Sequence, residues 1–271
     1  GRLTNPTEDV FEQRVAALEG GVAALAVASG AAAISYTIQN LAQAGDHIVA
    51  AKNIYGGTYN LLAHTLVQYG IETTFVDPFN FDEVEAAIKD NTKAVFIETL
   101  GNPNSDVVDI EKLADIAHAH KIPLAIDNTF ATPYLVRPIE YGADIVVHST
   151  SKYINGGGNS ISGVIIDSGN FKWDYDKFKG LAEYKKFGKF AYIAKLRNGI
   201  WRNVGGCLAP MNAFMNSVGL ETLGLRMERC CHNALKLAEF FESCEGIEVN
   251  YPALKASPFY DLCQEELGGK G

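Results

Sequence analysis

The sequence predicts an α/β protein with a mainly parallel sheet that is covered by helices on both faces. Short apolar runs are continuous rather than alternating, as in strands that are buried on both sides. Segments with helix-like spacing of apolar residues separate these runs, which is typical of repeated strand–helix units. The chain has 271 residues and is 47% hydrophobic, so it can bury a sizeable core.

Six apolar runs are expected to form the strands of this sheet. Most of them lack the polar–apolar alternation of a strand with one solvated face. The predicted strands are residues 47–51, 72–76, 94–98, 123–127, 144–149 and 163–167.

Between these strands, apolar residues at helical spacing predict helices, at 31–44, 58–70, 81–90 and 109–121. Residues 168–206 have weak periodicity, and no element is predicted there. A long helical pattern covers residues 208–242, and residues 247–253 are expected to form a strand. We therefore expect an α/β domain at residues 1–206. Residues 207–271 would be a connecting helix and the start of a smaller C-terminal domain.

The composition excludes several classes of partner. The net charge of −9, the pI near 5.2 and the lack of a basic stripe argue against nucleic acid or an anionic membrane surface. No run approaches the roughly 18 apolar residues of a membrane span. The five cysteines are odd in number and lack a C-x-x-C pattern, and the histidines show no ligand spacing. A reduced, cytoplasmic protein without a metal site is expected.

Polar residues follow several of the predicted strands, at the edge where ligands of open parallel sheets bind. A further polar group, Ser29 with Gly30 and Ala31, leads into a helix, where backbone N–H groups can bind an anion. The strand-end residues are Glu98 and Asn102 after one strand, Asp127 and Thr129 after the next, and Ser149, Ser151 and Lys152 after a third.

Each of these features has an ordinary structural explanation when it stands alone. Ser29 would serve as a helix N-cap, Asp127 as a turn cap and Lys152 as a solvated lysine. Their combination is more informative. Hydroxyls and a helix N-terminus suit a phosphate, a carboxylate suits a ring cation, and a lysine suits a Schiff base. The set therefore predicts a site for pyridoxal 5'-phosphate.

Each chemical group of this cofactor has an expected partner. Lys152 would react with the aldehyde, and Asp127 would pair with the pyridine nitrogen and hold its proton. The phosphate would be held by two hydroxyls and two backbone amides, those of Ser149, Ser151, Gly30 and Ala31.

Long motifs extend the prediction to nearly all 271 residues. They are "RLTNPTEDVFEQRVAALEGG", "GDHIVAAKNIYGGTYNLL", "ETLGNPN", "DNTFATPYLVRPIEYGADIVVHSTSKYINGGG" and "NAFMNSVGLETLGLRMERC". With these motifs the sequence resembles the Cys/Met-metabolism family of pyridoxal phosphate enzymes. The resemblance implies the fold of type I pyridoxal phosphate-dependent transferases. It also implies a homo-oligomer, either a dimer with shared active sites or a tetramer.

The resemblance implies roles for further residues. Tyr55 should stack on the cofactor ring and assist the leaving group, while Glu98, Asn102 and Thr129 should line the ring or its 3-oxygen. Arg2 should reach the phosphate of a neighbouring subunit. Without the resemblance, Tyr55 would be a packed loop aromatic and Asn102 a turn former.

Three features resemble the O-acetylhomoserine sulfhydrylase branch of the family. The stretch between "GVIIDSGNFKW" and "GGCLAPMNAF" is long, "LETLGLRMERC" is close to that branch, and Gly57 replaces a cysteine that is characteristic of methionine γ-lyases. The implied reaction is γ-replacement on O-acetylhomoserine with sulfide or a thiol, which gives homocysteine or methionine and acetate.

The sequence departs from the family pattern in two respects. Gly157 stands where many relatives have a histidine. Relatives also have an N-terminal arm and a C-terminal domain with the arginine that holds the substrate carboxylate, and we expect both segments to be missing from this chain.

Three alternatives are kept. The first is a γ-synthase or γ-lyase of the same family that acts on cystathionine, methionine or O-succinylhomoserine. The second is an inactive, cofactor-free binding module. The third is a nucleotide-binding domain, which is disfavoured because no G-x-G-x-x-G follows the first predicted strand and no Walker lysine is present.

Overall fold

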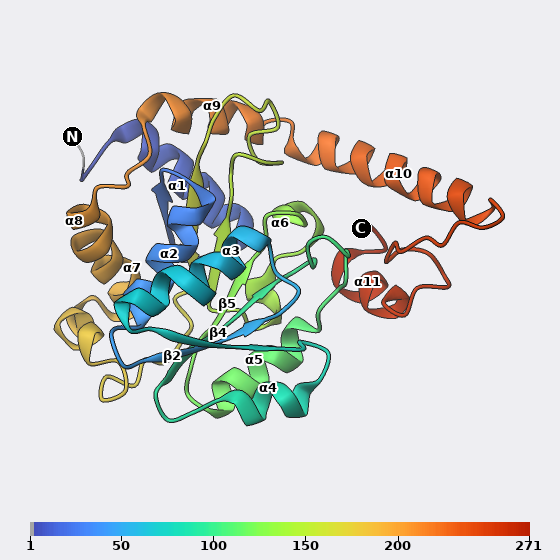
Figure 1. Ribbon diagram of the computed structural model, residues 1–271. Helices are drawn as coiled ribbons and strands as arrows, with labels where there is room; N and C mark the ends of the chain where they lie inside the picture. The colour runs from blue at the N-terminus through green and yellow to red at the C-terminus, as the bar shows by residue number, and fades with distance from the viewer. Residues whose placement is uncertain (1–2) are drawn as a thin grey trace.

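The computed structural model describes residues 3–271 (Figure 1). Arg2, expected to contact a neighbouring subunit, lies outside the described residues. A seven-stranded sheet forms the centre, in the order β1-β7-β6-β5-β4-β2-β3. Its strands are β1 (Ala23–Val27), β2 (His47–Ala51), β3 (Glu72–Val76), β4 (Thr92–Glu98), β5 (Leu124–Asp127), β6 (Ile145–His148) and β7 (Gly163–Asp167). The predicted fold class is confirmed.

The sheet is parallel except at β7, which pairs antiparallel with both β1 and β6. The structure confirms all six predicted strands, with identical bounds for β2, β3 and β7. The residues of β2 and β7 are all buried, as the continuous apolar runs require. The additional strand β1 is missing from the prediction, because its sequence "AALAV" is rich in alanine, which has low strand propensity.

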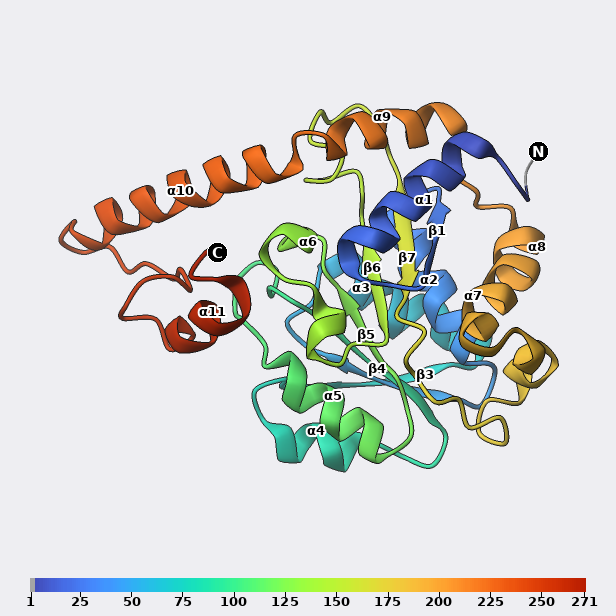
Figure 2. The same ribbon diagram turned by 180° about the vertical axis from the view of Figure 1, so that it is seen from behind.

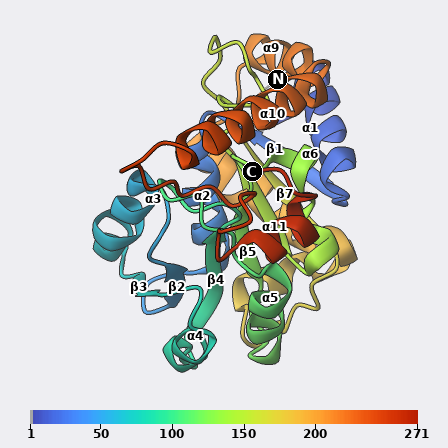
Figure 3. The same cartoon turned by 90° about the vertical axis from the view of Figure 1, so that its right-hand side faces the viewer.

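Helices cover both faces of the sheet. α2 packs on β6 and β7, and α1 packs on β1 and β7 from the opposite side (Figure 3). α1 also lies beside α9 (Figure 2). The helices of this part are α1 (Pro6–Glu19), α2 (Gly30–Leu41), α3 (Gly56–Asn60), the π-helix η1 (Leu61–Thr65), the 3-10 helix η2 (Leu66–Tyr69), α4 (Phe81–Ala87), α5 (Ile110–Ala119), α6 (Thr132–Leu135) and the 3-10 helix η3 (Pro138–Tyr141).

The remainder of the chain is largely helical. The elements are the 3-10 helix η4 (Lys179–Phe190), α7 (Ala191–Leu196), the π-helix η5 (Arg197–Trp201), α8 (Arg202–Val204), α9 (Pro210–Leu220), α10 (Leu223–Glu242) and α11 (Tyr260–Leu267). α10 projects away from the sheet (Figure 1). None of the helices within residues 3–271 has the length and apolar character that crossing a membrane requires.

Two predictions for this part are wrong. The expected single helix over 208–242 is two helices, because the chain turns after Leu220, where Gly219 approaches the backbone oxygens of Ile154 and Asn155. Residues 247–253 form no strand. That segment lies outside the sheet, and Ile247 is 47% exposed, so its apolar residues do not mark a buried strand.

Candidate active site

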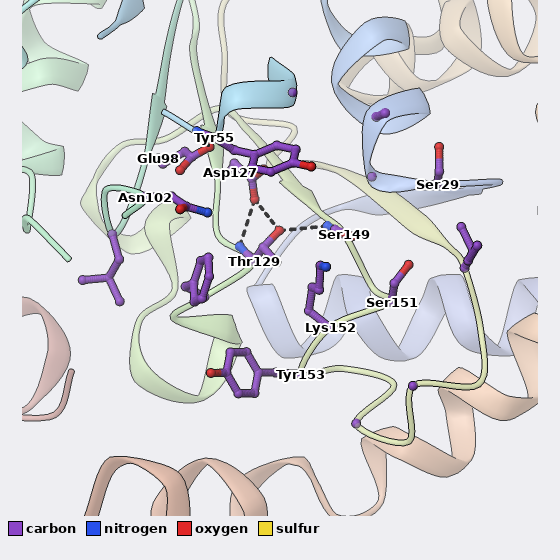
Figure 4. A pocket seen from close by; sticks show the side chains of 18 of the residues that line it. Ser29, Tyr55, Glu98, Asn102, Asp127, Thr129, Ser149, Ser151, Lys152 and Tyr153 are labelled. Atoms are coloured by element: carbon purple, nitrogen blue, oxygen red, sulfur yellow. Dashed lines mark hydrogen bonds between the residues drawn. The ribbon is translucent and has the colours of Figure 1, made fainter. Parts of the chain in front are cut away.

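A cavity of about 1320 Å³ opens at the carboxyl edge of the sheet (Figure 4). Every site residue that the sequence predicts within residues 3–271 lines it. These are Ser29, Gly30, Ala31, Tyr55, Glu98, Asn102, Asp127, Thr129, Ser149, Ser151 and Lys152. The parallel strands β4, β5 and β6 end at this edge and bring together residues that are far apart in the sequence.

Asp127 ends β5 and is oriented by Thr129. Its Oδ1 accepts hydrogen bonds from the Thr129 backbone N–H (2.9 Å) and hydroxyl (2.5 Å). The same hydroxyl oxygen accepts from the Ser149 backbone N–H at 2.8 Å, which ties β5 to the chain after β6. Burial raises the pKa of Asp127, and the hydrogen bonds from Thr129 oppose that rise. Because both bonds go to Oδ1, Oδ2 remains available to a ligand.

Glu98 lies beside Asp127, since the two residues are partners in the register of β4 and β5. Glu98 is 6% exposed, and its Oε1 accepts a hydrogen bond from the Tyr55 backbone N–H at 2.7 Å. Burial, and then repulsion from Asp127, raise the pKa of Glu98 to about 8. Glu98 therefore anchors the loop that carries Tyr55, in addition to lining the cavity.

The N-terminus of α2 lines the part of the cavity where we predict that an anion binds. Ser29 caps this helix, with its Oγ accepting from the Ala32 N–H at 3.0 Å. A Cβ at Gly30 would lie 2.5 Å from the Ser149 Cβ, so only glycine permits this close approach. The first N–H groups of a helix have no partner within it, and they favour an anion here.

Lys152 lies in the segment that connects β6 to β7. It is exposed, and its amine is directed towards the group formed by Thr129 and Ser149 (Figure 4). Ser151, one of the two predicted phosphate hydroxyls, exchanges hydrogen bonds with the Ser162 backbone, at 3.1 and 2.9 Å. Its hydroxyl therefore shapes this segment as well as lining the cavity.

Sequence reasoning missed one wall of the cavity. This wall comes mainly from α10, which begins about 70 residues after Lys152 in the chain. A local sequence pattern cannot show that two segments so far apart line the same cavity. Tyr153 and Phe130 were missed as well, and their rings meet edge-on with centroids 6.1 Å apart. The missed residues of α10 and its approach are Thr222, Leu225, Arg226, Arg229 and Cys230.

The residues of the cavity fit pyridoxal phosphate. A buried carboxylate with one free oxygen suits a protonated ring nitrogen, and the α2 N-terminus suits a phosphate. The exposed amine of Lys152 can reach an aldehyde. Within residues 3–271 no cluster of His, Cys, Asp and Glu could hold a metal.

Comparison with known proteins agrees with this site. The chain matches the family described as Cys/Met metabolism PLP-dependent enzymes over residues 1–271, and it belongs to that family. Pyridoxal phosphate is the cofactor of the family, which confirms the predicted cofactor.

Two curated relatives are similar to this chain over almost its whole length. The chain is 47% identical to a sulfhydrylase of Fusarium oxysporum, over 98% of this chain and 65% of the relative. It is 48% identical to the O-acetyl-L-homoserine sulfhydrylase of Leptospira meyeri, over 96% of this chain and 63% of the relative. The chain thus spans slightly less than two thirds of the length of these relatives.

Solved structures show the same relationship. The O-acetylhomoserine sulfhydrylase of Wolinella succinogenes matches with a TM-score of 0.90 and 41% identity, over 97% of this chain and 76% of that one. A candidate O-acetylhomoserine (thiol)-lyase of Campylobacter jejuni also matches with a TM-score of 0.90, at 39% identity over 98% of this chain and 69% of that one. The Campylobacter structure contains N'-pyridoxyl-lysine-5'-monophosphate.

Proposed function

We propose that this protein catalyses γ-replacement on O-acetylhomoserine, in which sulfide or a thiol displaces acetate to give homocysteine or methionine. The observation that carries the proposal is the convergence of Lys152, Asp127 and the α2 N-terminus on one cavity. The choice of substrate is supported by relatives named O-acetylhomoserine sulfhydrylases, at 48% and 45% identity.

Each residue of the cavity has its own proposed role. Asp127 holds the proton of the ring nitrogen, and Thr129 keeps the Asp127 carboxylate oriented. The N–H groups of Gly30 and Ala31, with the hydroxyls of Ser149 and Ser151, would hold the phosphate. The Ser151 hydroxyl would have to turn its proton from the Ser162 carbonyl to do so. The ring of Tyr55 would stack on the cofactor ring, and Asn102 would line the ring or its 3-oxygen.

Lys152 is the residue that moves protons. Once freed by the substrate, its amine accepts the proton of the α-carbon and then relays a proton from the β-carbon, so that acetate can leave from the γ-carbon. Acid–base assistance of this kind contributes about 10²–10⁴-fold to a rate. Pyridoxal phosphate, when bound, supplies the electron sink for the charge released at the α-carbon.

The test supplies the protein with O-acetylhomoserine, with and without sulfide. Homocysteine, ammonia and 2-oxobutanoate are quantified over time. The proposal predicts homocysteine and acetate in equal amounts, and only with sulfide. Ammonia and 2-oxobutanoate as the main products in both reactions would instead indicate a γ-lyase. A relative at 43% identity is named L-methionine gamma-lyase, so this outcome is the main alternative. If no visible absorption appears with pyridoxal phosphate, the chain would be a cofactor-free binding module.

We also propose the organisation of the protein. Residues 1–206 would form the cofactor-binding domain, and residues 207–271 would be a connecting helix and part of a C-terminal domain. The active protein would be a cytoplasmic homodimer or homotetramer, with Arg2 reaching the phosphate of a neighbouring subunit. Support comes from the resemblance to the family, and for a reducing compartment from the five free cysteines.

A further inference from the structure

The segment that carries Lys152 is held by a helix from far along the chain. We define the lysine loop as residues 149–162, between β6 and β7. Lys152 itself is exposed, so packing of its own side chain does not fix its position. The parts of the lysine loop behind it are buried, with Thr150 and Ser162 both 0% exposed.

Asn216 of α9 reaches into this buried part of the lysine loop and is itself 0% exposed. Its Nδ2 donates to the Ser162 hydroxyl at 2.8 Å and to the Thr150 hydroxyl at 3.3 Å. Its Oδ1 accepts from the Asn155 side chain at 3.2 Å. The side-chain amide of Asn216 thus donates two hydrogen bonds and accepts one, and its three partners lie at three positions of the lysine loop.

These contacts continue within the lysine loop. The Thr150 hydroxyl donates to the Ser162 hydroxyl at 2.7 Å, which joins the two ends of the loop. The Asn155 side chain accepts from the Gly157 backbone N–H at 3.1 Å and contacts Asn159 at 3.0 Å. Buried polar groups of this kind destabilise the fold when a partner is lost, because they then remain both unpaired and out of contact with water. The geometry of the loop therefore depends on the amide of Asn216.

Arg226 of α10 holds the outer side of the same loop. Its guanidinium donates to the Tyr153 carbonyl at 2.6 Å and to the Gly219 carbonyl at 2.9 Å. A Cβ at Gly156 would lie 2.3 Å from its Cζ. The lysine loop is thus enclosed between the sheet edge and two helices that follow β7 in the sequence.

We propose that Asn216 is a positioning residue: its side-chain amide fixes the lysine loop and thereby orients the amine of Lys152 in the cavity. The consequence for the cofactor rests on the proposed function. The consequence for the loop concerns this chain alone and can be measured without the cofactor.

The test compares the protein with its Asn216→Leu variant. Leucine has a side chain of similar branched shape but cannot form any of the three hydrogen bonds. Ser217→Ala is the matched control, because the Ser217 hydroxyl donates only to the Ala213 carbonyl of the same helix. Should Asn216→Leu fail to fold, Asn216→Ser is used, since a smaller polar residue leaves room for water. Thermal unfolding establishes that each variant is folded.

The first readout is hydrogen exchange of the cofactor-free protein. The amides of Asn155 and Gly156, which donate to the Thr150 and Lys152 carbonyls, should exchange about tenfold faster or more in the Asn216 variant. The amides of β5 should keep their exchange rates, and Ser217→Ala should match the wild type. Unchanged exchange in the loop, or acceleration that is equal in the loop and β5, would overturn the proposal.

The second readout is the affinity for pyridoxal phosphate, followed through the visible absorption of the lysine-bound cofactor. Asn216→Leu should bind roughly tenfold more weakly, because the loop must be ordered on binding. Equal affinities would contradict the proposed orientation of Lys152. A wild-type protein that shows no such absorption would contradict the proposed function instead, and the exchange experiment would still decide the role of Asn216.

Discussion

The two walls of the cavity differ in how firmly the chain holds them. On the sheet-edge wall, Glu98 and Thr129 each bond to a distant part of the chain, and Thr129 in turn holds the Asp127 carboxylate. On the α10 wall, Leu225 is 76% exposed, and Arg229 and Cys230 are exposed as well. The sheet-edge wall is therefore preorganised by the fold, as a site for chemistry requires. On the α10 wall only Arg226 is described with bonds of this kind, to the Tyr153 and Gly219 carbonyls, and the exposed side chains around it mainly bound the space.

The largest effect is expected at Lys152. Lys152→Ala removes the amine that we propose binds the cofactor and moves protons, so turnover should fall by about 10²–10⁴-fold or more. The visible absorption of the lysine-bound cofactor should disappear. Lys172→Ala, at an exposed lysine outside the cavity, is the control and should behave as wild type. Absorption that survives in Lys152→Ala would contradict the assignment.

Asp127→Asn should have the next largest effect. The change keeps the size of the side chain but removes the negative charge that we propose holds the ring proton, and we expect turnover to fall by roughly 10²-fold. Thr129→Val removes one of the two hydrogen bonds to Oδ1 and should have a smaller effect in the same direction. Steady-state kinetics of both variants measure this order. A larger loss in Thr129→Val than in Asp127→Asn would contradict it.

The sheet-edge wall is also the part of the site that the sequence could predict. Each of its residues follows a buried apolar run, and the carboxyl ends of parallel strands share one edge. Asp127 and Lys152 could thus be placed near each other without knowledge of the strand order. The family resemblance implies that Glu98 lines the cofactor ring or its 3-oxygen. Its hydrogen bond to the Tyr55 backbone cannot be predicted from the sequence, because it depends on how the loop after β2 folds back.

The α10 wall could not be predicted, for a physical reason. Leu225 and Cys230 carry no distinctive pattern within their helix, and their place in the cavity depends on the turn after Leu220. That turn follows from the close approach of Gly219 to the lysine loop, which is a long-range contact. The strand β1 was missed for a related reason, since pairing with β7 rather than its own propensity stabilises it.

The pH dependence of stability tests the carboxyl pair of the sheet-edge wall. In the folded, cofactor-free protein the pKa of Glu98 is about 8, above the usual 4.5. Between these values the unfolded chain binds fewer protons at this position, so the free energy of unfolding falls as the pH rises. Glu98→Gln should therefore lose less stability than wild type between pH 5 and pH 8, roughly the window set by these two pKa values.

Urea unfolding at several pH values measures this difference. Buried acids that do not adjoin Glu98, such as Asp167 with a pKa of about 7, contribute equally to both proteins and cancel, so the difference reports the pair of Glu98 and Asp127. Glu245→Gln, at an exposed carboxylate, should leave the pH profile unchanged. Identical profiles for Glu98→Gln and wild type would show that Glu98 is ionised in the folded protein.

The smallest effect on stability is expected at Gly57, where the sheet-edge wall meets an exposed aromatic ring. A Cβ at Gly57 would lie 2.4 Å from Cε1 of Tyr55, whereas a Cβ at the neighbouring Gly56 would meet nothing within 4 Å. Tyr55 is 56% exposed, so its ring can move aside without opening the core. Gly57→Ala should therefore leave the melting temperature close to that of wild type but lower turnover by up to roughly 10²-fold, the loss that a misplacement of about an ångström can cause in a group proposed to contact the cofactor. Gly56→Ala should change neither quantity. If the two variants have equal turnover, the position of the Tyr55 ring does not limit the reaction. The preorganised part of the sheet-edge wall would then include Glu98 but not Tyr55.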